Sequence, residues 1–72
     1  MLVRDCKPGD IVQLTHNGYS VGNELIYKIT GFFEIGDAYV KAYKNHRQGK
    51  VNLCAYCECV LIDPKTDIVL KF

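Results

Sequence analysis

The sequence lacks any long apolar run and also lacks the composition of a disordered chain. No window approaches the roughly 18 apolar residues that a membrane-spanning helix requires. The opening residues, MLVRDCKPGD, contain no apolar stretch of signal-peptide length, so we expect a cytoplasmic protein with no membrane attachment. Only two of the 72 residues are proline, while 49% are hydrophobic and 24% are charged. These proportions are typical of a folded globule.

The residue constellations that most enzymes need are also missing. We find no nucleophile beside a base, no phosphate-binding glycine loop and no carboxylate pair placed for acid–base chemistry. Asp63 and Asp67 flank a turn and are interpreted as turn residues. A chain of this length buries only ~60% of its unfolded surface, which leaves no room for a catalytic cleft between layers. We therefore predict that the protein is not an enzyme and has no cofactor.

The pattern of apolar residues predicts strands and no helix. Apolar and polar residues alternate with the period of a strand, and turn signals such as Pro8-Gly9 separate the alternating segments. Gly31 marks a bend or bulge within its strand. The last long segment is too apolar for one surface strand, so a bulge or turn near Ala55-Tyr56 should divide it. The predicted strands span residues 10–14, 24–34, 38–44 and 51–63, with a tail strand at 68–72.

Short, bent strands of this kind bury two apolar faces most readily by closing into a small barrel, which also removes most exposed sheet edges. The segments KPGDIVQL (residues 7–14) and YKITGF (residues 27–32), with a glycine-containing loop between them, resemble the opening of SH3-like barrels, including those that carry the KOW motif. The fold expected for residues 1–72 is a single all-β domain, a five-stranded SH3-like barrel with a short C-terminal strand. The positions that match the motif are Gly9, Asp10, Val12, Gly18, Gly22 and Ile29.

The resemblance implies two kinds of function. KOW-type barrels include domains that bind RNA or single-stranded DNA. Free-standing barrels of this size resemble accessory or phage-encoded proteins that attach to a larger protein machine and modulate or inhibit it. The chain departs from the ribosomal KOW proteins in its formal net charge of only +1, and the third loop glycine of the motif would fall near Leu25. The fold therefore transfers more safely than the function.

The segment CAYCEC contains three of the four cysteines, Cys54, Cys57 and Cys59. A structural zinc site takes four thiolate or imidazole ligands, usually as two short-spaced pairs, and only Cys54 and Cys57 have that spacing. Free cysteine is commonly a small buried apolar residue, so we predict that CAYCEC is a bulged core strand and that no metal is bound. If a metal is bound, its ligands would be Cys6, Cys54, Cys57 and Cys59.

Positive charge gathers in one segment, KAYKNHRQGK at residues 41–50. This segment contains four basic residues and no acidic one, whereas the other 62 residues hold five basic and eight acidic groups. In the 38–44 strand, alternation should turn Ala38 and Val40 inward and the tyrosines outward. Outward lysines would also protect an edge strand from aggregation, but exposed tyrosine with arginine is typical of binding interfaces. The predicted partner-binding residues are Tyr39, Lys41, Tyr43, Lys44, His46, Arg47 and Lys50.

A basic face that carries tyrosines suits either an acidic protein surface or phosphates with stacked bases. The acidic remainder of the chain would repel a long duplex. We therefore predict a non-catalytic protein-binding module, an accessory or inhibitory protein that attaches to a larger protein machine through the basic, tyrosine-containing hairpin from Tyr39 to Lys50. The alternative is a KOW-type domain that binds RNA or single-stranded DNA, and a zinc-stabilised structural protein is the third.

Overall fold

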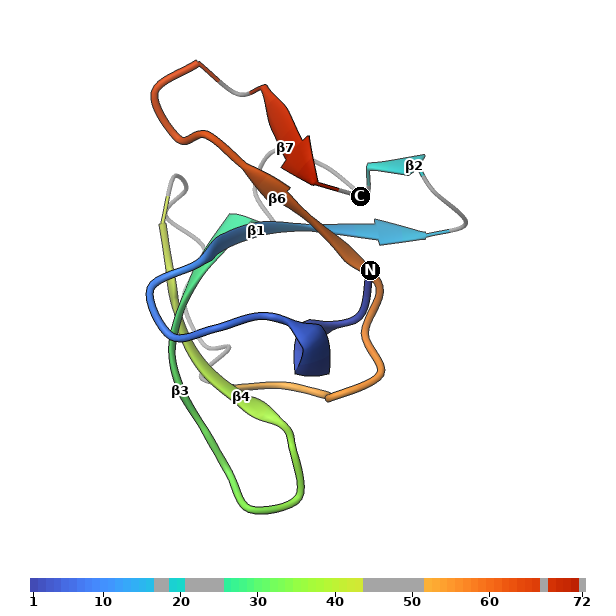
Figure 1. Ribbon diagram of the computed structural model, residues 1–72, viewed down its shortest axis with the longest axis vertical. Helices are drawn as coiled ribbons and strands as arrows, with labels where there is room; N and C mark the ends of the chain where they lie inside the picture. Colours follow the sequence, from blue (N-terminus) through green and yellow to red (C-terminus); the bar gives the residue numbers. More distant parts are fainter. Residues whose placement is uncertain (17–18, 21–25, 44–51, 67, 72) are drawn as a thin grey trace.

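The computed structural model describes residues 1–16, 19–20, 26–43, 52–66 and 68–71 (Figure 1). These residues form strands and one turn of 3-10 helix, η1 (Val3–Asp5), which confirms the predicted all-β class. No helix in these ranges is long and apolar enough to cross a membrane. The strands are β1 (Ile11–His16), β2 (Tyr19–Ser20), β3 (Ile26–Phe32), β4 (Ala38–Ala42), β5 (Asn52–Leu53), β6 (Cys59–Ile62) and β7 (Val69–Lys71).

The strands pair antiparallel in one sheet with the order β5-β4-β3-β1-β6-β7, and β2 pairs with the end of β1. The sheet bends, so that the β3–β4 hairpin turns away from β6 and β7 (Figure 1). Among the described residues β5 and β7 do not pair, so the sheet is open and the predicted closure into a five-stranded barrel is not observed. The two end strands contain only two and three residues, which leaves few backbone groups for a closing ladder.

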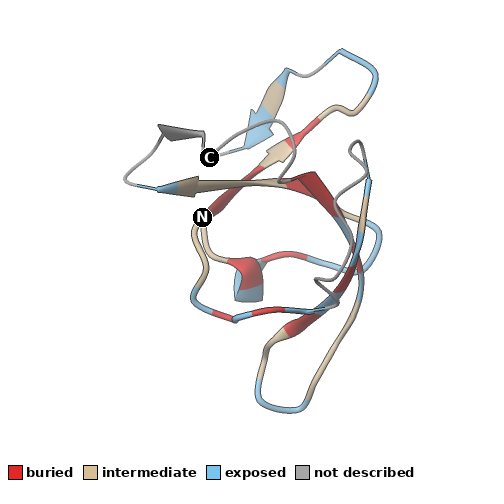
Figure 2. Ribbon diagram, turned by 180° about the vertical axis from the view of Figure 1, so that it is seen from behind, coloured by how far each residue is buried: buried red, intermediate tan, exposed pale blue. Residues whose placement is uncertain are grey.

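Apolar side chains pack on both faces of the sheet, because alternate residues of β1 and β6 belong to two different core clusters. Figure 2 marks the buried residues along the strands. This two-sided burial explains why the sequence of β6 is an unbroken apolar run. The main cluster lies between the sheet and η1 and contains Val3, Cys6, Val12, Tyr27, Ile29, Ala38, Val40, Leu53 and Cys59. The outer cluster, on the opposite face, contains Ile26, Val60 and Ile62, with Ile11 and Val69 packed against them.

The N-terminal segment covers the main cluster. The buried Val3 donates its N–H to the Cys57 carbonyl at 2.9 Å, and Arg4 donates its N–H to the Ala55 carbonyl at 3.0 Å. The Sγ atoms of Cys6 and Cys59 lie 3.8 Å apart. These contacts hold η1 against the connection between β5 and β6.

The CAYCEC segment is mostly a turn that leads into β6. Cys54 is exposed, the Cys57 N–H donates to the Cys54 carbonyl at 3.0 Å, and β6 begins at Cys59. The predicted division of the 51–63 segment near Ala55 is confirmed, but the prediction that CAYCEC is a core strand is wrong. The carboxylate of Asp37 gives the physical reason, because its Oδ1 accepts a hydrogen bond from the Ala55 N–H at 2.8 Å and so stabilises the turn.

Two glycines shape the β3–β4 hairpin. The pairing register shifts between Ile29 and Gly31, which confirms the bulge predicted at Gly31. At the tip of the hairpin, Gly36 has a φ of 95°, a conformation that residues with a Cβ rarely adopt. The hairpin therefore reaches its bend and its turn at glycine positions.

Candidate binding surface on the β3–β4 hairpin

The outward face of the β3–β4 hairpin carries exposed tyrosine and lysine side chains. In β4 a buried alanine and a buried valine alternate with the exposed Tyr39 and Lys41, which confirms the facing predicted from the sequence. Tyr43 follows β4, and its N–H donates to the Ile26 carbonyl at 3.0 Å, so the pairing with β3 continues beyond the strand end. Tyr39 and Tyr43 are 45% and 44% exposed. Both rings are therefore held on ordered backbone and are accessible from solvent.

Two exposed lysines lie directly opposite each other on this face. Lys28 of β3 is the antiparallel partner of Lys41 in β4. Like charges at directly opposed positions destabilise a strand pair, and neither lysine forms an ion pair with any residue in the described ranges. The exposed Thr30 adds a polar group on β3 and donates its hydroxyl to the Tyr39 carbonyl at 3.2 Å. An anionic group placed over the two lysines would relieve their repulsion.

Tyr39 also has a role within the fold. Its ring stacks on Phe33, with the ring centroids 3.9 Å apart and the planes inclined by 25°. Its Cδ2 atom would lie 3.8 Å from a Cβ built at Gly31, so the ring covers the glycine of the bulge. An aromatic ring over a strand glycine is a known means of stabilising a bent sheet. Tyr43 stacks on no aromatic ring among the described residues. Packing within the fold therefore accounts for the position of Tyr39 better than for that of Tyr43.

The structure places three of the seven predicted partner-binding residues, Tyr39, Lys41 and Tyr43, on one face. The other four, Lys44, His46, Arg47 and Lys50, lie outside the described residues. Sequence reasoning missed Lys28, although it lies on a strand that was predicted. Its position beside Lys41 follows from the β3–β4 register, which no local pattern in the sequence specifies.

The two buried cysteines, Cys6 and Cys59, lie in the main cluster. Burial raises the pKa of the Cys59 thiol from its ordinary value of 9.0 to about 12, with the contact to Cys6 as a further cause, and burial also raises the pKa of Cys6. Both thiols are therefore protonated at neutral pH, whereas nucleophilic and metal-binding cysteines act as thiolates. Within the described ranges no three His, Cys, Asp or Glu side chains come together as a possible metal site. His16 is exposed at the end of β1.

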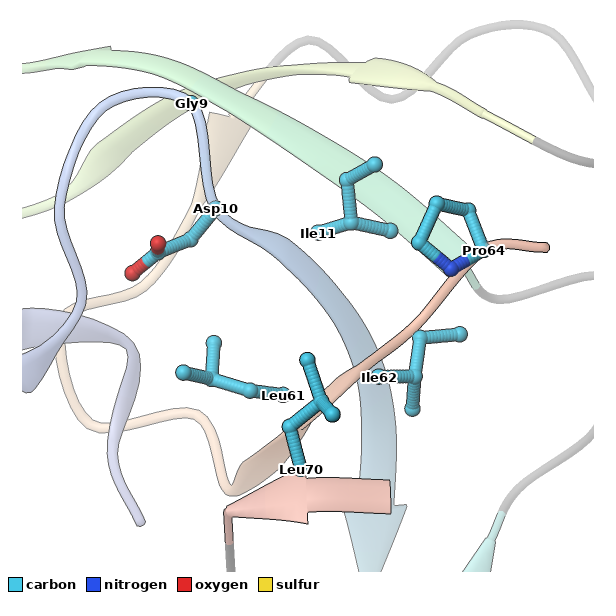
Figure 3. Close-up of a pocket in the computed structure, with 7 residues that line it drawn as sticks. All are labelled: Gly9, Asp10, Ile11, Leu61, Ile62, Pro64 and Leu70. Carbon is cyan, nitrogen blue, oxygen red and sulfur yellow. The ribbon is translucent and has the colours of Figure 1, made fainter. Parts of the chain in front are cut away.

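A shallow apolar groove lies away from the hairpin, beside β7 (Figure 3). Its volume is about 210 Å³. Asp10 contributes the one carboxylate of the lining. Its Oδ2 accepts a hydrogen bond from the Lys7 N–H at 2.7 Å, so this carboxylate stabilises the turn before β1. The other lining residues are Gly9, Ile11, Leu61, Ile62, Pro64 and Leu70.

Comparisons with other proteins add no family to this description. No family model, no curated protein and no solved structure matches the chain. The function must therefore be argued from the placement and chemistry of the chain's own residues.

Proposed function

We propose that the protein is a non-catalytic binding module that attaches to an acidic surface of a larger protein through the outward face of the β3–β4 hairpin. The observation that carries this proposal is the direct pairing of Lys28 with Lys41 beside the exposed Tyr43. Two adjacent lysines without a described carboxylate partner form a compact site for an anionic group. An accessible tyrosine next to them supplies the apolar contact area that interface centres favour.

The distribution of charge favours a protein partner over a nucleic acid. A protein that binds a long phosphate backbone usually presents positive charge over an extended surface. In this chain four of the nine basic residues lie in the segment 41–50, and acidic groups outnumber basic ones in the rest of the sequence. An acidic patch on a folded protein matches a small basic site better than a long duplex does. Binding to RNA or single-stranded DNA, the KOW-type function, is the alternative that the experiment below distinguishes.

The path of the chain supports an SH3-like fold as part of the proposal. Strands β3, β4 and β5 form a meander, and β1 pairs both with β3 and with β6. This arrangement pairs β1 with β6, the first and last of the five main strands in sequence, although the edge strands β5 and β7 do not pair among the described residues. In such a fold the β3–β4 hairpin projects from the body and can enter a partner's surface. An accessory or inhibitory role at a larger machine is proposed on this basis.

The test compares two charge-reversal variants of the full chain. Lys28→Glu combined with Lys41→Glu should abolish capture of the partner from a cell lysate, because each substitution replaces attraction by repulsion. The matched control, Lys7→Glu with Lys65→Glu, has the same net charge and changes exposed lysines away from the hairpin. Circular dichroism checks that both variants fold.

The purified partner then allows a quantitative measurement. Tyr43→Ala should weaken binding about fivefold or more in titration calorimetry, because truncating a tyrosine at the centre of an interface often costs more than about 1 kcal/mol. Equal loss of binding in both charge-reversal variants would refute a site on the hairpin. The KOW-type alternative would be established by a different result. The wild type and the Lys7→Glu/Lys65→Glu control would bind a generic single-stranded oligonucleotide in a salt-dependent manner, and Lys28→Glu/Lys41→Glu would not bind it.

A further inference from the structure

Two cysteines that are distant in the sequence meet inside the main cluster. Cys6 follows η1, and Cys59, 53 positions later, begins β6. Both side chains are buried, and their Sγ atoms lie 3.8 Å apart. The sulfurs of a disulfide lie ~2.05 Å apart, so the two thiols need to approach by only about 1.8 Å to form one. Cys6 belongs to the irregular segment between η1 and β1, and its backbone can follow such a shift.

The N-terminal segment that carries Cys6 is attached to the sheet by a short contact. It pairs with the residues before β6 through an isolated bridge between Leu2 and Glu58. The Val3 side chain, which has no exposed surface, anchors it in the main cluster. Segments held by few hydrogen bonds open locally at a lower cost than unfolding of the whole protein. Local opening of this segment would expose the Cys6 thiol while the sheet stays folded.

Burial of both thiols favours their disulfide once it has formed. A low pKa stabilises the reduced form of a cysteine pair and makes its disulfide easy to reduce. Burial raises the pKa of Cys6 and of Cys59, so the reduced pair gains no stability from a thiolate. The same burial shields the pair from thiols and oxidants in solution. The pair should therefore exchange slowly and, when oxidised, resist reduction.

We propose that Cys6 and Cys59 form a reversible disulfide that locks the N-terminal segment over the main cluster, with a small disulfide of the glutathione class as the oxidant and opening of the segment as the gate. When the segment opens, the Cys6 thiolate attacks one sulfur of the oxidant, forms a mixed disulfide and releases the first small thiol. As the segment closes, Cys59 loses its proton to solvent, and its sulfur attacks the Cys6 sulfur and displaces the second small thiol. Two protein thiols are thereby oxidised to one disulfide, and the oxidant is reduced to two thiols that take up the two protons.

The lock would act on the stability of the fold and not on the hairpin surface. The disulfide closes a loop from residue 6 to residue 59, which contains the whole β3–β4 hairpin. Such a cross-link stabilises a protein chiefly by restricting its unfolded chain. The Lys28–Lys41 pair lies on the hairpin, away from both cysteines in the sheet order, so the proposal does not depend on the binding function.

The first test oxidises the full chain with oxidised glutathione and compares it with the reduced protein. Mass spectrometry of proteolytic peptides should find Cys6 joined to Cys59, and the urea midpoint should rise by roughly 1 M or more. Cys6→Ser should show neither change. Cys54→Ala removes the exposed cysteine and should show both, as the wild type does. A disulfide between Cys54 and Cys57 in place of the buried one, or an unchanged wild-type midpoint, overturns the proposal.

The second test measures how fast the disulfide forms, and compares two valine truncations. Val3→Ala removes packing that holds the N-terminal segment closed, so it should accelerate formation roughly fivefold or more. Val60→Ala is the matched control, because it makes the same truncation in the outer cluster, and it should react at the wild-type rate. Circular dichroism checks that both variants are folded. Equal acceleration by the two variants would show that the pair reacts through general unfolding and would overturn the gate.

Discussion

The buried Cys59 should make the protein lose stability at alkaline pH. Cys59 has no exposed surface, and its Sγ lies 3.8 Å from that of Cys6. Because burial raises its pKa to about 12, the thiol of the folded protein stays protonated through a range in which the unfolded chain, with its ordinary pKa of 9.0, loses the proton. The unfolded state then binds fewer protons than the folded state. The contribution of Cys59 is therefore fully present below pH 9 and is lost as the pH rises from 9 toward 12.

The size of the effect follows from the two pKa values. Between pH 8 and pH 10, ionisation of Cys59 in the unfolded chain should lower the free energy of unfolding by about 1.4 kcal/mol. This figure depends on the ordinary pKa and hardly on the folded one, provided that the latter stays above about 11. Cys59→Ala removes the titrating group. It also leaves a small cavity, which costs roughly 1 kcal/mol at every pH and therefore does not alter the slope.

Urea unfolding under reducing conditions, at pH 8 and at pH 10, measures the predicted difference. Other groups also titrate in this range, so the relevant quantity is the pH-dependent loss of the wild type minus that of Cys59→Ala. We expect the wild type to lose about 1.4 kcal/mol more than the variant. Cys54→Ala removes an exposed cysteine and should behave as the wild type does. Equal losses in the wild type and in Cys59→Ala would show that the reasoning is wrong.

Two further predictions concern the hairpin and the turn that contacts it. Asp37→Ala should lower the free energy of unfolding by about 1–2 kcal/mol, because the Ala55 N–H loses its acceptor. Gly36→Ala should destabilise by a similar amount, about 1–2 kcal/mol, since its φ is 95° and a Cβ would lie 3.4 Å from that of Ala55. Gly31→Ala is the matched control, because its nearest contact would be an ordinary 3.8 Å, and it should be neutral or stabilising by up to about 1 kcal/mol. Urea unfolding at pH 7 measures all three, and an unchanged midpoint in Asp37→Ala, or equal effects of the two glycine variants, would contradict them.

Local patterns in the sequence predicted the strands well and their relations poorly. Alternation identified the exposed face of β4, and the glycine rule identified the bulge at Gly31, because both depend on neighbouring residues alone. The pairing of Lys28 with Lys41 depends on register between two strands. The turn that exposes Cys54 depends on Asp37, a residue distant in the sequence. Strand β2 was not predicted, since two residues are too few to show a period.

The predicted barrel closure is not observed among the described residues, and the reason again lies in contacts between residues that are distant in the sequence. Five alternating segments specify that apolar faces must be covered, but not what covers them. Here η1 places Val3 over the main cluster, so the N-terminal segment covers surface that a closing strand pair would otherwise cover. A three-residue helical turn leaves no periodic signal in a sequence, which is why this cover was not foreseen.

The central position of β1 has a consequence for how the chain is made. One edge of β1 pairs with β3, and its other edge pairs with β6, which lies much later in the sequence. The contact of Cys6 with Cys59 likewise joins residues 53 positions apart. During synthesis on a ribosome the early strands therefore emerge long before their final partner. Until residue 62 has left the exit tunnel, the nascent chain exposes an unpaired edge of its innermost strand. Such distant contacts slow folding and leave partly folded chains open to aggregation, so the sheet should be completed only after β6 has emerged from the ribosome.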